Sequence, residues 1–157
     1  MRQSNPRRKR AFSLIELVIV VVIIGIIAAI AIPRMSRGAE GAADAALIGD
    51  LAVMRSAIDL FVTEHTGQEP SSAGNFEAEM TGKTNLAGTA GSGAGFIYGP
   101  YLRAMPPLPV GTVNKGENGV TALAGTPGFG WVYDSANETI VANTADTDVN
   151  GDPYSDF

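Results

Sequence analysis

The segment FSLIELVIVVVIIGIIAAIAIP, residues 12–33, decides how the rest of the sequence is interpreted. Between residues 12 and 32 its only clearly polar residues are Ser13 and Glu16. As an α-helix this stretch would be about 30 Å long, which is enough to cross the hydrocarbon core of a bilayer. We therefore expect the chain to enter a membrane through this segment.

The charges outside this segment are unevenly distributed. The chain has 157 residues with 11 Lys and Arg against 16 Asp and Glu. From residue 12 onward there are six basic and 16 acidic residues, a net charge of −10. An acidic remainder excludes a broad nucleic-acid footprint, which needs clustered Lys and Arg. The other five basic residues precede the apolar segment and predict a cytoplasmic N-terminus, with the rest sent outward; they are Arg2, Arg7, Arg8, Lys9 and Arg10.

The residue types that most often carry catalysis are scarce. There is no cysteine, which removes a disulfide framework, a thiolate zinc site and a cysteine nucleophile. No Gly-x-Ser-x-Gly turn is present to supply the serine of a catalytic triad. The one histidine, His65, is expected to cap a helix end or lie on the surface. The sequence therefore disfavours an enzyme.

After Pro33 the pattern becomes that of an amphipathic helix that ends before Gly67. We expect one long helix over 12–66, kinked at Pro33 because proline lacks a donor and crowds the preceding turn. Its apolar stripe recurs at intervals of four, three, four and three residues; the stripe is Leu47, Leu51, Met54, Ile58 and Phe61.

Beyond the helix the chain is rich in glycine and proline, so we expect many loops. Residues 82–95 and 105–111 are predicted to be irregular. Strand signals occur at 119–123, 128–134 and 138–143, and the last two segments predict a β-hairpin.

The N-terminal residues resemble those of type IV pilins and type II secretion pseudopilins. The shared features are a basic leader, a small residue, FSLIE, an otherwise uncharged apolar run and a closing proline. The resemblance implies cleavage between Ala11 and Phe12 by a prepilin peptidase, which then methylates the new amine of Phe12. The family usually has glycine where this chain has Ala11. Because alanine is also small, we expect processing to be slower or unchanged.

The resemblance also implies a pilin-like α+β fold, in which the C-terminal half of the long helix packs on a small antiparallel sheet. Here the contacts would be made with Trp131, Tyr133 and Ile140. Gly25 and Pro33 match the family's helix-softening positions. The expected parts are a cleaved leader (1–11), a transmembrane and assembly helix (12–33), an amphipathic helix (34–66) and a loop-rich β region (67–157).

Glu16 would be the fifth residue of the mature chain. A carboxylate inside a membrane span costs several kcal/mol, so it normally has a partner. Cleavage creates an ammonium at Phe12, and in a filament Glu16 of one subunit can neutralise the ammonium of its neighbour. The alternative is that Ser13 and Glu16 form a capping box at the helix N-terminus.

An ordinary secretory signal peptide is the rival interpretation of the N-terminus. Cleavage after Ala31 would then leave a protein that begins at Ile32. Glu16 argues against this interpretation, because a signal peptide gains nothing from a carboxylate near the start of its apolar core.

Residues 99–111 resemble a segment of the major type II secretion pseudopilin, although Leu108 and Val110 replace its aspartate and tryptophan. We therefore expect a periplasmic pseudopilus subunit in a single-pass inner-membrane protein. The implied partners are like subunits, the prepilin peptidase and methyltransferase, an inner-membrane platform and a cytoplasmic assembly ATPase. The alternatives are a type IV pilus subunit and a membrane-tethered binding module that does not polymerise.

The acidic tail has oxygen-bearing side chains at alternate positions, with Gly151 at the sixth. This pattern is typical of the first half of an EF-hand calcium loop, although Phe157 stands where the twelfth-position glutamate belongs. Major pseudopilins carry calcium in their C-terminal loops, so the resemblance favours Ca²⁺. The alternative is a solvated tail with an Asn-Gly turn. The candidate ligands are Asp146, Asp148, Asn150 and Asp152.

Overall fold

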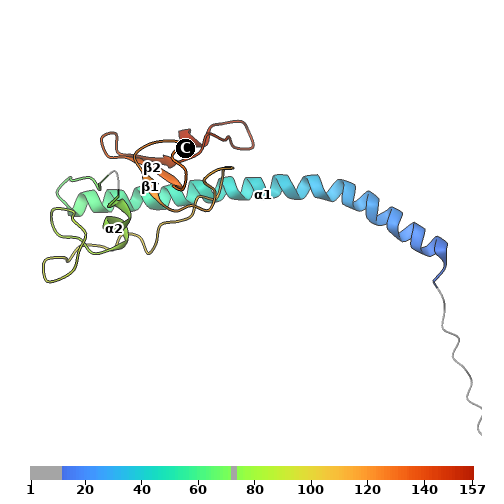
Figure 1. Cartoon of the computed structure of the whole chain (residues 1–157), viewed down its shortest axis with the longest axis horizontal. Coiled ribbons are helices and arrows are strands. Elements are labelled where there is room, and N and C mark those ends of the chain that lie inside the picture. The colour runs from blue at the N-terminus through green and yellow to red at the C-terminus, as the bar shows by residue number, and fades with distance from the viewer. Residues whose placement is uncertain (1–11, 72–73) are drawn as a thin grey trace, which may run out of the picture. The chain divides into compact units, whose positions relative to one another are not determined.

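The computed structural model describes residues 12–71 and 74–157, without the side chains of 32–37. Two helices, a three-stranded sheet and a short 3₁₀ helix make up its regular structure (Figure 1). This is the α+β architecture that the sequence predicts. The elements are α1 (Leu14–Glu64), α2 (Phe76–Thr81), β1 (Val120–Thr121), β2 (Trp131–Asp134), β3 (Thr139–Ala142) and η1 (Tyr154–Asp156).

The contacts divide the chain into two units, Met1–Gly38 and Ala39–Phe157. In the first unit, the stretch Leu14–Ala31 of α1 has a mean hydropathy of 3.2 and is long and apolar enough to cross a membrane. The helix assignment includes Pro33. The kink expected there falls within residues 32–37, whose placement lies outside what the structure describes, and it stays a prediction.

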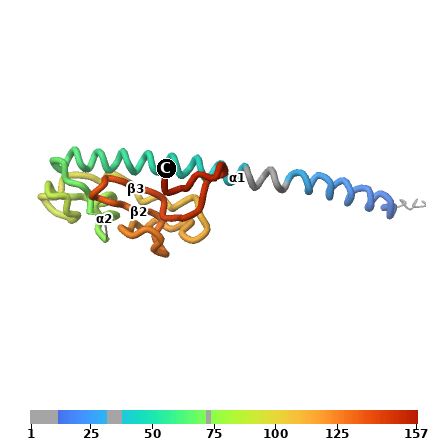
Figure 2. Tube along the Cα trace, turned by 90° about the horizontal axis from the view of Figure 1, so that it is seen from above, coloured from blue at the N-terminus to red at the C-terminus, as the bar shows by residue number. Residues whose placement is uncertain are grey.

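In the second unit, the apolar stripe of α1 packs on the sheet. Every residue of the predicted stripe from Leu47 to Phe61 is at most 6% exposed. The stripe forms one core cluster with Trp131, Tyr133 and Ile140, as predicted. The strands lie along this part of α1 in both views (Figures 1 and 2). Because a hairpin alone is marginally stable, burial of about 1.5–3 kcal/mol per large apolar side chain holds the sheet in place.

The sheet is mixed, whereas an antiparallel sheet was expected. Strands β2 and β3 form the predicted antiparallel hairpin, with Trp131 opposite Ala142 and Asp134 opposite Thr139. Strand β1, however, pairs with β2 in parallel. A parallel neighbour requires the intervening chain to return to the same end of the sheet.

Two buried asparagines hold that returning loop. The side-chain amide of Asn143 donates to the carbonyl oxygens of Thr126 and Phe129, each at 2.8 Å. Its Oδ1 accepts a hydrogen bond from the backbone N–H of Gly125 at 2.7 Å. Asn114 donates to the carbonyl oxygen of Asn143 at 2.8 Å. These amides join residues far apart in the sequence, which is why the strand pattern alone did not predict the parallel pairing.

Helix α2 was not expected from the sequence. Phe76 and Met80 lie one turn apart and are both buried. The buried carboxylate of Glu79 accepts hydrogen bonds from the backbone N–H and the hydroxyl of Ser71, at 2.7 and 2.8 Å. The segments 82–95 and 105–111 lie outside the helices and strands of the fold and are irregular, as predicted.

His65 does not lie on the surface, because its side chain is fully buried, but it does cap the C-terminal end of α1, as expected. The ring stacks on Phe61 with centroids 4.0 Å apart. Its Nδ1 lies 2.7 Å from the carbonyl oxygen of Phe61, and its Nε2 lies 3.0 Å from Oγ1 of Thr84. The chain around Thr84 therefore covers the end of α1, a long-range contact that the helix pattern could not reveal.

Two leucines of α1 offer a matched test of this packing. Leu51 is 1% exposed and Leu60 is 49% exposed. We expect Leu51→Ala to lower the free energy of unfolding by about 2–5 kcal/mol, because it leaves a cavity in the core. Leu60→Ala should change it by less than about 1 kcal/mol. Urea unfolding measures both, and equal losses would contradict the packing.

Candidate functional site

The N-terminal stretch of α1 is an apolar surface that none of the described residues covers. Every large apolar side chain from Phe12 to Ile30 is between 41% and 81% exposed. A helix that is apolar all round belongs in a membrane or against other apolar helices. Such a continuous surface needs a lipid or protein environment.

Glu16 is the only charged residue of this stretch. Its Oε2 accepts a hydrogen bond from the backbone N–H of Ser13 at 3.0 Å. This bond is one of the two that define a capping box, so the capping interpretation has structural support in the single chain. The carboxylate remains exposed and available to a second group.

The structure shows less about the roles of the other predicted N-terminal site residues. Phe12 is exposed, whereas Ala11 and the leader lie outside the described residues. A Cβ added at Gly25 would meet no atom within 4 Å. Contacts within one chain therefore do not require glycine there, which leaves helix softening at Gly25 and Pro33 as a prediction.

A second stripe of α1 lies beside the core stripe and is partly open to solvent, with Ala57 as its one buried member. Its members repeat at intervals of four, three, four, three and four residues. Each member immediately precedes a buried residue, which is either a residue of the core stripe or His65. The members are Ala46, Asp50, Val53, Ala57, Leu60 and Glu64. Val53 is 58% exposed and Leu60 is 49% exposed. This spacing places the side chains on one face of the helix.

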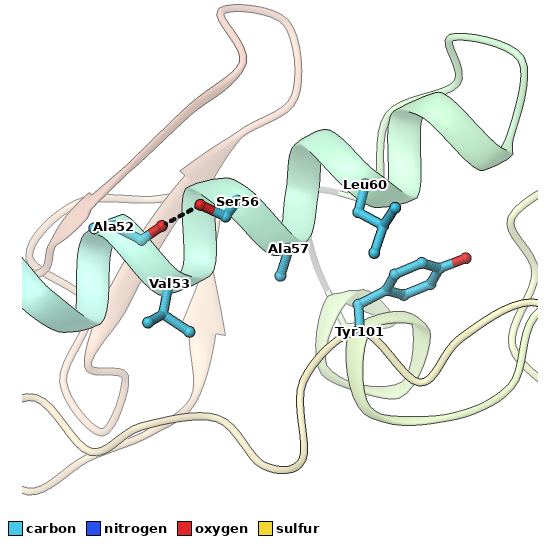
Figure 3. A pocket seen from close by; sticks show the side chains of 6 residues that line it. All are labelled: Ala52, Val53, Ser56, Ala57, Leu60 and Tyr101. Atoms are coloured by element: carbon cyan, nitrogen blue, oxygen red, sulfur yellow. Dashed lines mark hydrogen bonds between the residues drawn. The ribbon is translucent and has the colours of Figure 1, made fainter.

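An open groove of about 420 Å³ runs along this stripe, with Tyr101 on its other side (Figure 3). The remaining lining residues are small or aliphatic: Ala52, Val53, Ser56, Ala57 and Leu60. Figure 3 shows the Tyr101 ring facing Leu60 across the groove. We call this surface the α1 groove.

Hydrogen bonds between tyrosines and carboxylates fasten the loops around α1. Tyr101 donates to Oε2 of Glu64 at 2.7 Å, and burial together with this bond raises the pKa of Tyr101 to about 12. Tyr154 donates to Oδ1 of Asp44 at 2.6 Å, in the buried interior. Burial and the hydrogen bond to Asp44 also raise the pKa of Tyr154. Both bonds join α1 to segments far along the chain.

The acidic tail does not gather its four candidate ligands around one point. Oδ2 of Asp146 accepts hydrogen bonds from the backbone N–H and the hydroxyl of Thr112, at 2.7 and 2.9 Å. Oδ1 of Asp148 accepts from the backbone N–H groups of Asn150 and Asp152, both at 2.8 Å. Within 12–71 and 74–157, no group of three or more His, Cys, Asp or Glu is placed to hold a metal ion. The Asn-Gly turn is thus present, and calcium binding stays a prediction.

Residues 99–111 contribute four side chains to the core, which are Leu102, Met105, Leu108 and Val110. Leu108 and Val110, which differ from the pseudopilin pattern, are 1% and 2% exposed. The indole N–H of Trp131 donates to the carbonyl oxygen of Pro106 at 2.8 Å. Both substituted side chains are therefore packing residues of this fold.

Sequence reasoning missed several residues that shape the site. Asp44 precedes the core residue Leu47 by three positions, so a polar residue on the buried face was a usable signal. Arg55 donates to the carbonyl oxygens of Ile140 and Phe157, at 3.2 and 2.5 Å. A local sequence pattern does not indicate contacts between residues that lie so far apart in the sequence.

Comparison with known proteins gives one match. The family model described as the prokaryotic N-terminal methylation motif matches residues 6–32. No curated protein and no solved structure matches the chain.

The motif indicates a type IV pilin-like or pseudopilin precursor. It implies processing by a prepilin peptidase and polymerisation into pilus-like filaments. Together with the apolar helix, it suggests a single-pass anchor in the inner membrane. It also suggests a structural subunit instead of an enzyme.

The raised tyrosine pKa predicts a loss of stability in alkali. A tyrosine whose folded pKa lies above its usual value of 10.0 stabilises the fold fully below that pH. This stabilisation disappears as the pH rises from about 10 towards about 12, where Tyr101 ionises in the fold. Unfolding by urea across this range should show a smaller pH dependence for Tyr101→Phe than for the wild type. An unchanged dependence would contradict the Tyr101–Glu64 bond.

Proposed function

We propose that this chain is a subunit of the periplasmic pseudopilus of a type II secretion system. Cleavage between Ala11 and Phe12 and methylation of the new amine prepare it for polymerisation. The observation that carries the proposal is the uncovered apolar helix with one carboxylate, Glu16, four residues from the new N-terminus. The methylation motif over residues 6–32 supports the same chemistry.

Pairing between Glu16 and a neighbour's N-terminal amine sets the register of the filament. Outside water, an unpaired carboxylate or ammonium is strongly disfavoured, whereas the two together attract strongly. An arrangement that leaves Glu16 unpaired is therefore penalised. The hydrogen bond from Ser13 uses one oxygen of Glu16 and leaves the negative charge for the amine.

The α1 groove supports packing between copies. Its small and aliphatic residues recur at the three- and four-residue spacing that receives a helix. The chain itself supplies an apolar helix, Leu14–Ala31, that needs such a surface. One sequence thus provides both partners of the contact.

The work of such a subunit is mechanical. Copies leave the bilayer, extend a fibre and push secreted proteins outward, with the platform and cytoplasmic ATPase supplying the drive. The pseudopilin-like segment 99–111 and the absence of cysteine favour this role. A type IV pilus subunit is the second candidate, favoured by the methylation motif, which both classes carry.

Substitution of Glu16 separates charge pairing from helix capping. Glu16→Gln retains an oxygen that accepts the Ser13 N–H but removes the charge. We expect Glu16→Gln and Glu16→Ala to abolish filament assembly while membrane insertion continues, as measured by electron microscopy and membrane fractionation. Assembly by Glu16→Gln but not by Glu16→Ala would assign Glu16 to capping.

A tethered module that does not polymerise would be unaffected by either change. N-terminal sequencing and mass spectrometry of the mature protein supply the accompanying check. We expect the mature protein to begin with N-methylated Phe12. A chain that begins at Met1 or Ile32 would contradict it.

We further propose that the tail loop around Asp146–Asp152 binds Ca²⁺. Ion binding would replace the Asp148 hydrogen bonds with coordination, since carboxylate oxygens are the ligands that calcium prefers. We expect Ca²⁺ to raise the melting temperature of the full chain and a chelator to reverse the rise, with Asp148→Ala abolishing it. Mg²⁺ is the control ion. No response of the wild type to Ca²⁺ would refute the site.

A further inference from the structure

The carboxylates of the second unit differ in whether they have a hydrogen-bond partner. Within 39–71 and 74–157, eight Asp and Glu side chains are buried or partly buried. Asp50 is the one that accepts no hydrogen bond from any described residue, and it lies in no ion pair there. The other seven accept at least one: Asp44, Glu64, Glu69, Glu79, Asp134, Asp146 and Asp148.

Asp50 lies on the second stripe of α1, one helical turn before Val53 of the α1 groove. Its burial raises the pKa of its carboxyl group, and no hydrogen bond offsets that effect. A partly desolvated charge without a partner is unfavourable in the single chain. This face of α1 therefore carries an acceptor that has no donor among the described residues.

We propose that Asp50 is a docking residue that receives a basic side chain from a second copy of this chain. The inference rests on the proposed function, because it names a contact within the filament. The cation lies at a different place on the chain from Asp50, so the same contact can repeat head-to-tail from copy to copy and stay open-ended, as a filament requires.

The chain offers the complementary charge in few places. Residues 39–157 contain four Lys and Arg against fifteen Asp and Glu. Arg55 already donates to two carbonyl oxygens within its own chain. The remaining three are exposed, and their side chains form no hydrogen bond or ion pair with described residues; they are Lys83, Arg103 and Lys115. A Lys or Arg side chain of a neighbouring copy would pair with the Asp50 carboxylate and would add no further negative charge next to residues 39–157, which are already acidic.

The first test removes the charge of Asp50 in the full, processed chain. Asp50→Asn should reduce the amount of filament by about tenfold or more, because the neighbour's cation would be left without its acid. The control is Glu117→Gln, which removes one charge from an exposed acid and should leave assembly unchanged. If both variants assemble like the wild type, the docking role of Asp50 is wrong.

Unfolding of the unassembled chain in detergent excludes a purely structural role. Because Asp50 lacks a partner there, Asp50→Asn should be at least as stable as the wild type. A loss of stability would show that Asp50 has a partner within its own chain and would overturn the proposal.

Cross-linking identifies the partner. The sequence contains no cysteine, so Asp50→Cys gives one thiol for a photoreactive label. In filaments with excess wild-type chain, the label should join a second copy at a peptide that contains Lys or Arg. Cross-links only within one chain, or only to another protein, would overturn the proposal. Failure of the wild type to polymerise would instead refute the proposed function.

Discussion

The constraint on which the rest depends is that an apolar helix with a single carboxylate must leave water. The large apolar side chains from Phe12 to Ile30 are not covered by any part of the chain that the structure describes, and Glu16 is the one charge in this stretch. Burial of this helix is strongly favourable for its apolar surface and strongly unfavourable for an unpaired Glu16. In the proposed filament, a processed N-terminal amine on an adjacent copy would resolve that conflict and would link leader cleavage to polymerisation.

In the second unit, too, some apolar and charged side chains are covered by the chain and others are left exposed. The core stripe of α1 is buried by the sheet, while Val53 and Leu60 of the neighbouring stripe remain exposed along the α1 groove. Tyrosine hydrogen bonds to Glu64 and Asp44 hold distant segments against α1. Asp50 has no such donor among the described residues, so the second stripe combines apolar and electrostatic features that would suit the proposed contact with a second copy.

The sequence predicted the features that arise from local periodicity. The core stripe, the β-hairpin and the irregular segments followed from spacing and from proline and glycine content. The parallel β1 did not, because the amides of Asn114 and Asn143 hold its loop through contacts between distant residues. The burial of His65 was missed for a similar reason, since Thr84 and its neighbours cover it. At the candidate site, Glu16 was evident as a charge within an apolar run, whereas the groove required the position of Tyr101.

The most direct test is the structure of the assembled filament at the level of side chains. The proposal predicts that the Glu16 carboxylate lies within about 4 Å of the N-methylated amine of Phe12 in an adjacent copy, which is ion-pair distance. A filament in which Glu16 contacts only the Ser13 amide of its own chain, with the amine elsewhere, would contradict the account.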